Sequence, residues 1–482
     1  MIFIYFKKQS YEQKNIKKSA SSKCGINAHD SCACGRDRHS DTEHVVAVPE
    51  NICKDRVRKF GAMTCDLKLI AVWLKECQIE TVAMESTGVY WKPLFSLLVQ
   101  EGFEVYLVNS KTIKNVSGRK TDEDDAMWIQ KLHSCALLKS SYLPDDQQDM
   151  LRTLVRYRRS LVQDSSRFVN RMQKSMELMN IKFHTVINDI VGKTGTAVVE
   201  AIIGGERTAE NFLPLIGKTI KADHETIRKS LEGNWREDHL FTLKESYELY
   251  KTYQQRIVEI DKQIEKQLQQ YEAKCNEGII EDKKNNSNKN ETDKSNIAAT
   301  VPAKQKKVKK KKDKNHPSFD TRGFLERILG VDVLAIFGLS ETSGLEILAE
   351  TGTDLSRWEN EAHFRSWLNL CPNNKISGGK VISSRMMKKK PNAASQAFRY
   401  AANGVQRSDN WLGDYFRRMK TKGGNKYAVV ATASKIATIY YKMVRYKEEF
   451  TPLDLEEYKE KHKLAKIAYL ERALKRLKEK AA

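Results

Sequence analysis

The sequence predicts an α/β domain followed by a mainly helical, basic remainder. From Cys32 to about residue 145, short apolar runs alternate with amphipathic segments, which is typical of strands alternating with helices. Beyond residue 146 the strand patterns nearly vanish, and apolar residues recur every three or four positions. With 482 residues and 40% hydrophobic content, the chain is long enough for two or three domains with cores of their own.

The N-terminal part divides into a leader and the α/β domain. Residues 1–31 turn polar after six apolar residues and are rich in Lys and Ser, so we expect a disordered leader there. The α/β domain is expected over residues 32–145. Its strands are predicted at 44–48, 57–60, 81–84 and 103–108, and its helices at 67–77 and 91–101.

Residues 146–275 are predicted to form long helices. An apolar stripe at helical spacing runs from Leu151 to Met179, and basic side chains occupy the other faces, so a long basic helix is expected. A second stripe, from Leu249 to Tyr271, has the spacing of a coiled coil or of a long helical hairpin. A helix pair within the chain and a seam between two subunits both fit this pattern.

The remainder combines a linker with a further helical domain. Residues 276–318 contain few apolar side chains and include a run of lysines, which predicts a disordered basic linker. Residues 319–450 are predicted to form a mainly helical domain, and residues 451–482 a charged C-terminal helix. The segment 328–340 fits either a helix–hairpin–helix turn that binds phosphate or a plain pair of helices.

The charge balance points to a nucleic-acid partner. The chain has 84 Lys and Arg against 62 Asp and Glu, a formal net charge of +22. No apolar stretch approaches the ~20 residues of a membrane span, so no membrane association is expected. Nine cysteines without framework spacing fit a reducing compartment. We therefore expect a cytoplasmic protein associated with the nucleoid.

Acidic residues suggest a metal site in the α/β domain. Glu85 follows a predicted buried strand, at the edge where open α/β sheets bind ligands. Asp122 and Asp125, at a spacing of three, share one face of the helix they begin. Each alone is explained by helix capping or an ion pair, but together they suit two Mg²⁺ ions for phosphoryl transfer. Asp37 is the candidate for a further ligand, with Asp30 as its rival.

A glycine-rich loop is expected at residues 371–380, and it contains Ser377. Basic side chains follow it, including Arg385. The residues alone supply no His and Asp pair to activate the serine, and a turn residue is the simpler interpretation.

Three stretches carry a resemblance to a known family: Val82-Ala83-Met84-Glu85-Ser86-Thr87-Gly88-Val89-Tyr90-Trp91, the segment 108–126, and Asn170-Arg171-Met172-Gln173-Lys174. The chain resembles the DEDD-type insertion-sequence transposases related to the Piv and MooV DNA invertases, a family of bridge-RNA-guided recombinases. The resemblance implies that the N-terminal domain is RNase H-like, of the RuvC type, and that it holds Mg²⁺ through Asp37, Glu85, Asp122 and Asp125. It also implies that Ser377 attacks DNA to form a covalent intermediate.

Further expectations follow from this resemblance. It implies double-stranded DNA and a structured guide RNA as partners, and a homodimer or higher homo-oligomer. The side chains expected at nucleic acid are Arg119, Lys120, Arg171, Lys174, Lys380, Arg385, Arg417 and Arg418.

Two alternatives remain open. One is a RuvC-like junction nuclease that uses the same carboxylates with water as the nucleophile. The other is an inactivated transposase that only binds nucleic acid, because Arg36 and Arg38 flank Asp37, where the family usually has apolar residues.

Overall fold

The computed structural model divides the chain into two compact units, residues Met1–Leu143 and Pro144–Ala482. It describes residues 2–6, 43–50, 52–53, 55–86, 88–109, 121–138, 140–286, 315–387 and 392–481.

The first unit is built on a sheet whose five described strands have the order β3-β2-β1-β4-β5. The strand β2 runs antiparallel to both of its neighbours, whereas β1, β4 and β5 are parallel. The strands are β1 (Ile2–Phe6), β2 (Glu43–Ala47), β3 (Val57–Gly61), β4 (Thr81–Glu85) and β5 (Glu104–Val108). The last four lie where strands were predicted, because short alternating or continuous apolar runs predict strands.

The central strand is the exception. Structure was expected to begin near Cys32, yet Ile2–Phe6 forms β1 between β2 and β4. The prediction of a leader is wrong for these residues, because the run Ile-Phe-Ile-Tyr-Phe has the β-branched and aromatic side chains that favour a strand with neighbours on both sides. Residues 7–31 lie outside the described residues.

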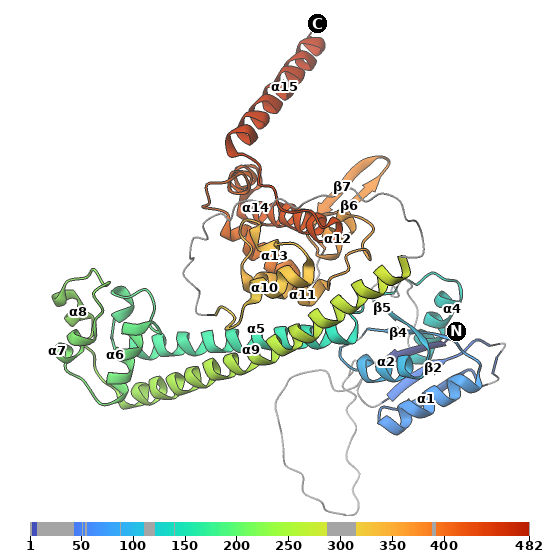
Figure 1. Ribbon diagram of the computed structural model, residues 1–482, viewed down its shortest axis with the longest axis horizontal. Coiled ribbons are helices and arrows are strands. Elements are labelled where there is room, and N and C mark those ends of the chain that lie inside the picture. Colours follow the sequence, from blue (N-terminus) through green and yellow to red (C-terminus); the bar gives the residue numbers. More distant parts are fainter. Residues whose placement is uncertain are drawn as a thin grey trace, which may run out of the picture. The chain divides into compact units, whose positions relative to one another are not determined.

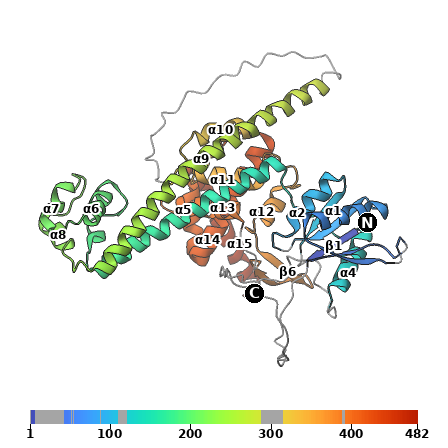
Figure 2. The same ribbon diagram turned by 90° about the horizontal axis from the view of Figure 1, so that it is seen from below.

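Helices cover both faces of the sheet (Figures 1 and 2). On one face α1 (Thr64–Glu76) and α2 (Trp91–Gln100) pack on Val46, Val82 and Met84. On the other face α4 (Asp122–Ser134) packs on a smaller cluster that contains Val45, Ala47, Ala83 and Val108. Side chains alternate along β4, so Ala83 points toward α4, and Glu85, two residues later, is on the same side.

The second unit contains a long antiparallel helix pair, α5 (Asp146–Leu178) and α9 (Glu237–Asn286). Ile257, Ile264 and Leu268 of α9 share a buried cluster with Leu151 and Val155 of α5. The predicted apolar seam is therefore buried within one chain in this structure. Helix α9 also extends through residues 276–286, so the prediction of a disordered linker is wrong for that segment. Residues 287–314 lie outside the described part of the chain.

A small helical cluster caps one end of this pair (Figure 1). Its core joins Met172, Met176 and Leu243 of the long helices to Phe183, Val198 and Phe212. The elements are η1 (Phe183–Thr185), α6 (Lys193–Ile203), α7 (Ala209–Phe212), η2 (Leu213–Leu215) and α8 (His224–Ser230).

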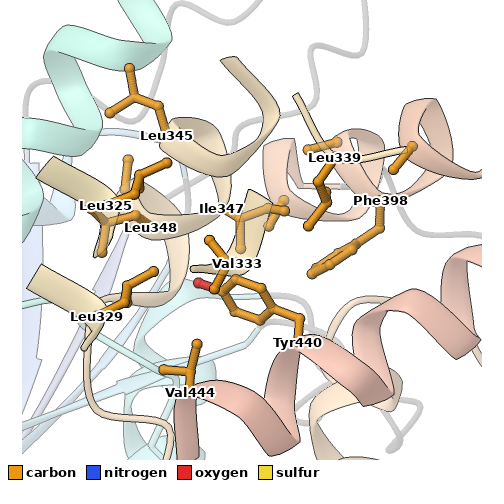
Figure 3. Close-up of a cluster of buried hydrophobic side chains, with 14 of the residues drawn as sticks. Leu325, Leu329, Val333, Leu339, Leu345, Ile347, Leu348, Phe398, Tyr440 and Val444 are labelled. Atoms are coloured by element: carbon orange, nitrogen blue, oxygen red, sulfur yellow. The ribbon is translucent and has the colours of Figure 1, made fainter. Parts of the chain in front are cut away.

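The buried cluster of the long helix pair continues into the last part of the chain, where Tyr440 lies among aliphatic side chains and Phe398 (Figure 3). The remaining elements are α10 (Thr321–Leu329), η3 (Val333–Ala335), α11 (Glu341–Thr351), α12 (Glu361–Trp367), β6 (Asn373–Ser377), β7 (Lys380–Arg385), α13 (Ala393–Gly404), α14 (Trp411–Tyr446) and α15 (Leu455–Ala481). Helix α14 bends at Gly424, whose φ of 78° and ψ of 179° are not helical. Within the described residues, no helix is both long and apolar enough to cross a membrane.

Candidate active site

The first acidic candidate, Glu85, ends the buried strand β4. Its side chain is only 4% exposed, and the next backbone amide, of Ser86, donates to the carbonyl of Val108 at 2.9 Å. This bond continues the pairing of β4 with β5 and holds the chain where it leaves the sheet. The structure therefore places a buried carboxylate at the carboxyl edge of parallel strands, as the sequence predicted.

The first turn of α4 carries four consecutive acidic residues, and the structure separates them into two pairs. Thr121 caps the helix by accepting from the Asp124 amide at 3.2 Å, and its hydroxyl donates to the Asp124 carboxylate at 2.5 Å. Glu123 forms an exposed ion pair with Lys59 of β3 at 2.8 Å. Asp124 and Glu123 thus point outward, whereas Asp122 and Asp125 are half-buried on the side of α4 that also carries buried Ala126 and Ile129.

Helix α4 and strand β4 run in opposite directions on this face. The Thr81 hydroxyl at the start of β4 lies 3.1 Å from Nε2 of His133 at the end of α4. From Thr81 to Glu85 the strand advances ~13 Å, and from His133 back to Asp125 the helix advances ~12 Å. Glu85 is therefore carried toward the end of α4 that holds Asp122 and Asp125.

His133 lies at the opposite end of this face. Its ring packs edge-on against Tyr106, with the ring centroids 4.8 Å apart, and burial lowers its pKa. His133 is therefore a neutral side chain that is hydrogen-bonded to Thr81 and packed against Tyr106, and it lies far from the acidic end of this face.

The donor types suit a hard cation, because Mg²⁺ prefers carboxylate oxygens. However, among the described residues no group of three or more His, Cys, Asp or Glu side chains is arranged to hold a metal ion. The central strand β1 adds no acidic residue. Asp37, Arg119 and Lys120 lie outside the described residues. The described carboxylates are thus chemically suitable but do not by themselves complete a ligand set.

The expected glycine-rich loop is a β-hairpin, so that prediction is corrected. Strands β6 and β7 are joined by Gly378 and Gly379, which have φ values of 53° and 74°. Two residues with positive φ form the type of tight turn that suits the twist of antiparallel strands, and glycine adopts it without strain. Ser377 and Lys380 flank the turn as a directly opposed pair, and both are exposed.

Most arginines of α5 are committed to ion pairs inside the second unit. Arg152 and Arg156 hold Glu350 of α11 at 2.8 and 2.7 Å. Arg158 binds Asp261 of α9 at 2.5 Å, and both side chains are almost fully buried. The arginines near the start of α5 therefore have partners within the chain, and Arg158 among them is buried. Arg171, whose guanidinium lies 5.0 Å from the ring centre of Phe168, and Lys174 remain as the predicted nucleic-acid contacts of α5.

The arginines of α14 also have internal partners. Arg417 donates to the carbonyl of Ser408 at 3.1 Å, although its side chain is exposed. Arg418 binds Asp414 at 3.0 Å and the hydroxyl of Tyr458, and its guanidinium lies over the ring of Tyr458. These bonds attach α15 to α14, which is a structural role that the sequence did not reveal.

One feature of the hairpin went unrecognised in the sequence. Ile376, Val381 and Ile382 are exposed aliphatic side chains beside Ser377 and Lys380. The dipeptide Gly378-Gly379 between two short runs containing β-branched residues is a hairpin signal, so the strands and their outward aliphatic residues were in principle predictable.

Comparison with known families gives two matches in chain order. A family model described as DEDD transposase of the IS110 type matches residues 34–181. A second, described as transposase of the IS116/IS110/IS902 family, matches residues 332–417. The first includes Glu85 and the start of α4, and the second includes the β6–β7 hairpin. No curated protein matches the chain.

Proposed function

The chain is a DEDD-type transposase related to the IS110 family, and on this premise we propose that it cleaves and exchanges DNA strands with a serine nucleophile and a set of acidic metal ligands. The nucleophile is Ser377. The proposed ligands of two Mg²⁺ ions are Asp37, Glu85, Asp122 and Asp125. One observation carries this proposal. Of the four acidic residues in the first turn of α4, only Asp122 and Asp125 lie on the side that faces the sheet, and Glu85 at the end of β4 lies toward the same end of α4.

We assign the first unit to the RNase H-like class. The strand order β3-β2-β1-β4-β5, with only β2 antiparallel to its neighbours, supports this assignment. So does the position of Glu85 at the end of β4.

The proposed reaction is a transesterification. The Oγ atom of Ser377 attacks a backbone phosphorus, an Oγ–P bond forms, and the bond from phosphorus to one sugar oxygen breaks. The proton released by the hydroxyl balances the proton taken up by the leaving sugar oxygen. Attack by the sugar hydroxyl of another strand then reverses the step and frees Ser377. One phosphodiester replaces another, so no external energy source is required.

The chain's own residues have separate tasks in this scheme. The hairpin presents Ser377 at the exposed end of β6, beside the turn. Lys380, directly opposite, contributes positive charge beside the attacked phosphate. Bound Mg²⁺ would add charge stabilisation at the phosphate oxygens.

We also propose a guide RNA and a homodimer or larger homo-oligomer, located in the cytoplasm at the nucleoid. The net charge of +22 supports a polyanionic partner. For RNA the support is the family resemblance together with Arg171 and Lys174, because the other α5 arginines discussed above are paired internally.

The test is covalent adduct formation by purified protein with DNA carrying the element's ends and the flanking noncoding RNA, in Mg²⁺ or EDTA. Ser377→Ala abolishes the adduct. Asp122→Asn lowers strand cleavage by about 10²-fold or more. Glu123→Gln, the matched control on the same helical turn, stays within about twofold, because an exposed ion pair contributes little.

Other outcomes separate the alternatives. Metal-dependent cutting that survives Ser377→Ala indicates a hydrolytic nuclease instead. Salt-sensitive DNA binding without cutting indicates an inactivated copy. In that case the absence of an acidic residue from the central strand β1 would help to explain the loss of activity. Mn²⁺ binding followed by electron paramagnetic resonance provides a readout independent of activity, and it weakens in Asp122→Asn but not in Glu123→Gln.

A further inference from the structure

The β6–β7 hairpin exposes aliphatic side chains that no other described part of the chain covers. Ile376, Val381 and Ile382 are 63%, 57% and 70% exposed. Single exposed aliphatic residues are common on protein surfaces, but three together at the tip of a two-stranded ribbon form a patch. Such a patch indicates a surface that a partner covers, because burying each side chain is favourable.

The geometry of the hairpin sets these side chains next to Ser377. Ile376 and Val381 are directly opposed across the two strands, so they point to the same face of the ribbon. The next pair toward the turn is Ser377 and Lys380. The register shifts between Lys375 and Ile376, which leaves Ile382 as the extra residue of a bulge. A bulge re-aims a side chain, and here it adds a third aliphatic group beside the pair.

The charge around the hairpin selects the chemistry of the partner. Residues 362–408 contain no Asp or Glu and nine Lys or Arg. On the hairpin itself, Lys375, Lys380 and Arg385 are exposed, and none of them forms an ion pair within the described residues. A surface that combines aliphatic side chains with unopposed positive charge is suited to a polyanion that also presents apolar groups.

Duplex DNA meets both requirements. Its major groove admits a two-stranded β-ribbon, phosphates line the groove, and thymine methyl groups offer apolar contacts inside it. We propose that the β6–β7 hairpin enters the major groove, with Ile376, Val381 and Ile382 against base edges and with Arg385 and the two lysines at phosphates. The inference rests on the proposed function and deepens it, since it names the element that brings Ser377 to the backbone.

The first test measures the affinity of the full chain for a fluorescent duplex of mixed sequence as a function of salt, without Mg²⁺. Ile382→Ser lowers affinity about tenfold without changing the salt slope, because it removes apolar contact only. Arg385→Gln lowers affinity and reduces the slope by about 0.9, because one phosphate contact is lost. The matched controls Ile467→Ser and Lys461→Gln, on the exposed helix α15, bind like the parent chain.

The second test places a photoreactive benzophenone amino acid at position 382. Crosslinking to DNA, with protection of guanine N7 from dimethyl sulfate in the major groove, supports the inference. Crosslinking to a second protein chain, or unchanged affinity in Ile382→Ser, overturns it. Neither test requires cleavage, so adduct formation through Ser377 alongside an inert Ile382→Ser would refute the groove contact while leaving the proposed function intact.

Discussion

Replacing Asp261 by asparagine is expected to destabilise the second unit by about 3 to 5 kcal/mol, the usual cost of breaking a buried ion pair. The Asp261 carboxylate accepts from Arg158 at 2.5 Å and from the backbone amide of Ser318 at 2.9 Å. Arg158 also donates to the carbonyl of Asn315 at 3.0 Å. The pair therefore joins α5, α9 and the chain that leads into α10. Asparagine keeps the shape but leaves the buried Arg158 charge without its hydrogen-bonded counterion.

The assay is urea unfolding of the full chain followed by circular dichroism. The matched control is Asp164→Asn, which breaks an ion pair with Arg167 on the same helix α5. The arginine of that pair is 71% exposed and the aspartate 32%, so solvent screens the pair and its loss costs about 1 kcal/mol or less. The double variant Arg158→Met with Asp261→Leu recovers most of the stability, because two apolar groups leave no buried charge. If Asp261→Asn were no more costly than Asp164→Asn, the assignment of Arg158 to the interior would be refuted.

Three further predictions concern the core and the backbone. Burial lowers the pKa of His44 to about 4 from its ordinary value of 6.5, against the opposing effect of Asp66. As pH falls, the histidine of the unfolded chain is therefore protonated before that of the folded chain. The folded protein loses stability as pH falls from about 6.5 toward 4, by roughly 3 kcal/mol in total. His44→Gln removes this part of the pH dependence of the urea midpoint, and an unchanged profile would contradict the assignment. Gly338→Ala is expected to cost more than Gly205→Ala, because both have positive φ but only at Gly338 does an added Cβ meet a backbone oxygen, that of Ala401, at 2.4 Å; equal melting temperatures would argue against that contact. Leu348→Ala, in the core shown in Figure 3, is expected to cost 2 to 5 kcal/mol or thereabouts, whereas Leu249→Ala on the exposed side of α9 changes the unfolding free energy by less than about 1 kcal/mol.

Much of the secondary structure was predictable because it depends on local pattern. The strands β2 to β5 and the helices α1 and α2 lie within one to three residues of their predicted bounds. The acidic turn of α4 was recognisable because Asp122 to Asp125 stand at a helix N-terminus, where the backbone dipole favours negative charge. The run Ile2–Phe6 has the composition of a strand, but it was assigned to the leader because the polar residues that follow it give no local indication of its partners β2 and β4.

For the candidate site, too, the sequence shows some features and only the folded chain shows the others. The types and spacing of Glu85, Asp122, Asp125 and Ser377 are visible in the sequence, and the two transposase family matches include the segments that contain them. Their surroundings are not visible. Glu123 and Asp124 have the same chemistry as their neighbours, and only the packing of α4 on the sheet shows that they point outward. Equally, Ser377 stands in a hairpin because the two strands pair, with Ser377 opposite Lys380.

The amino-acid order alone therefore accounts for fold class, most element bounds, the basic charge and the list of acidic candidates, because each of these depends on composition or on residues within a few positions. The ion-pair partners of the arginines, by contrast, could be identified only from the folded chain. Arg158 and Asp261 are 103 positions apart, and Arg152 and Glu350 are 198 apart. A side chain at a helix surface binds solvent, nucleic acid or a buried carboxylate according to what the distant chain places beside it, and that neighbour is set only when α5, α9 and α11 pack together.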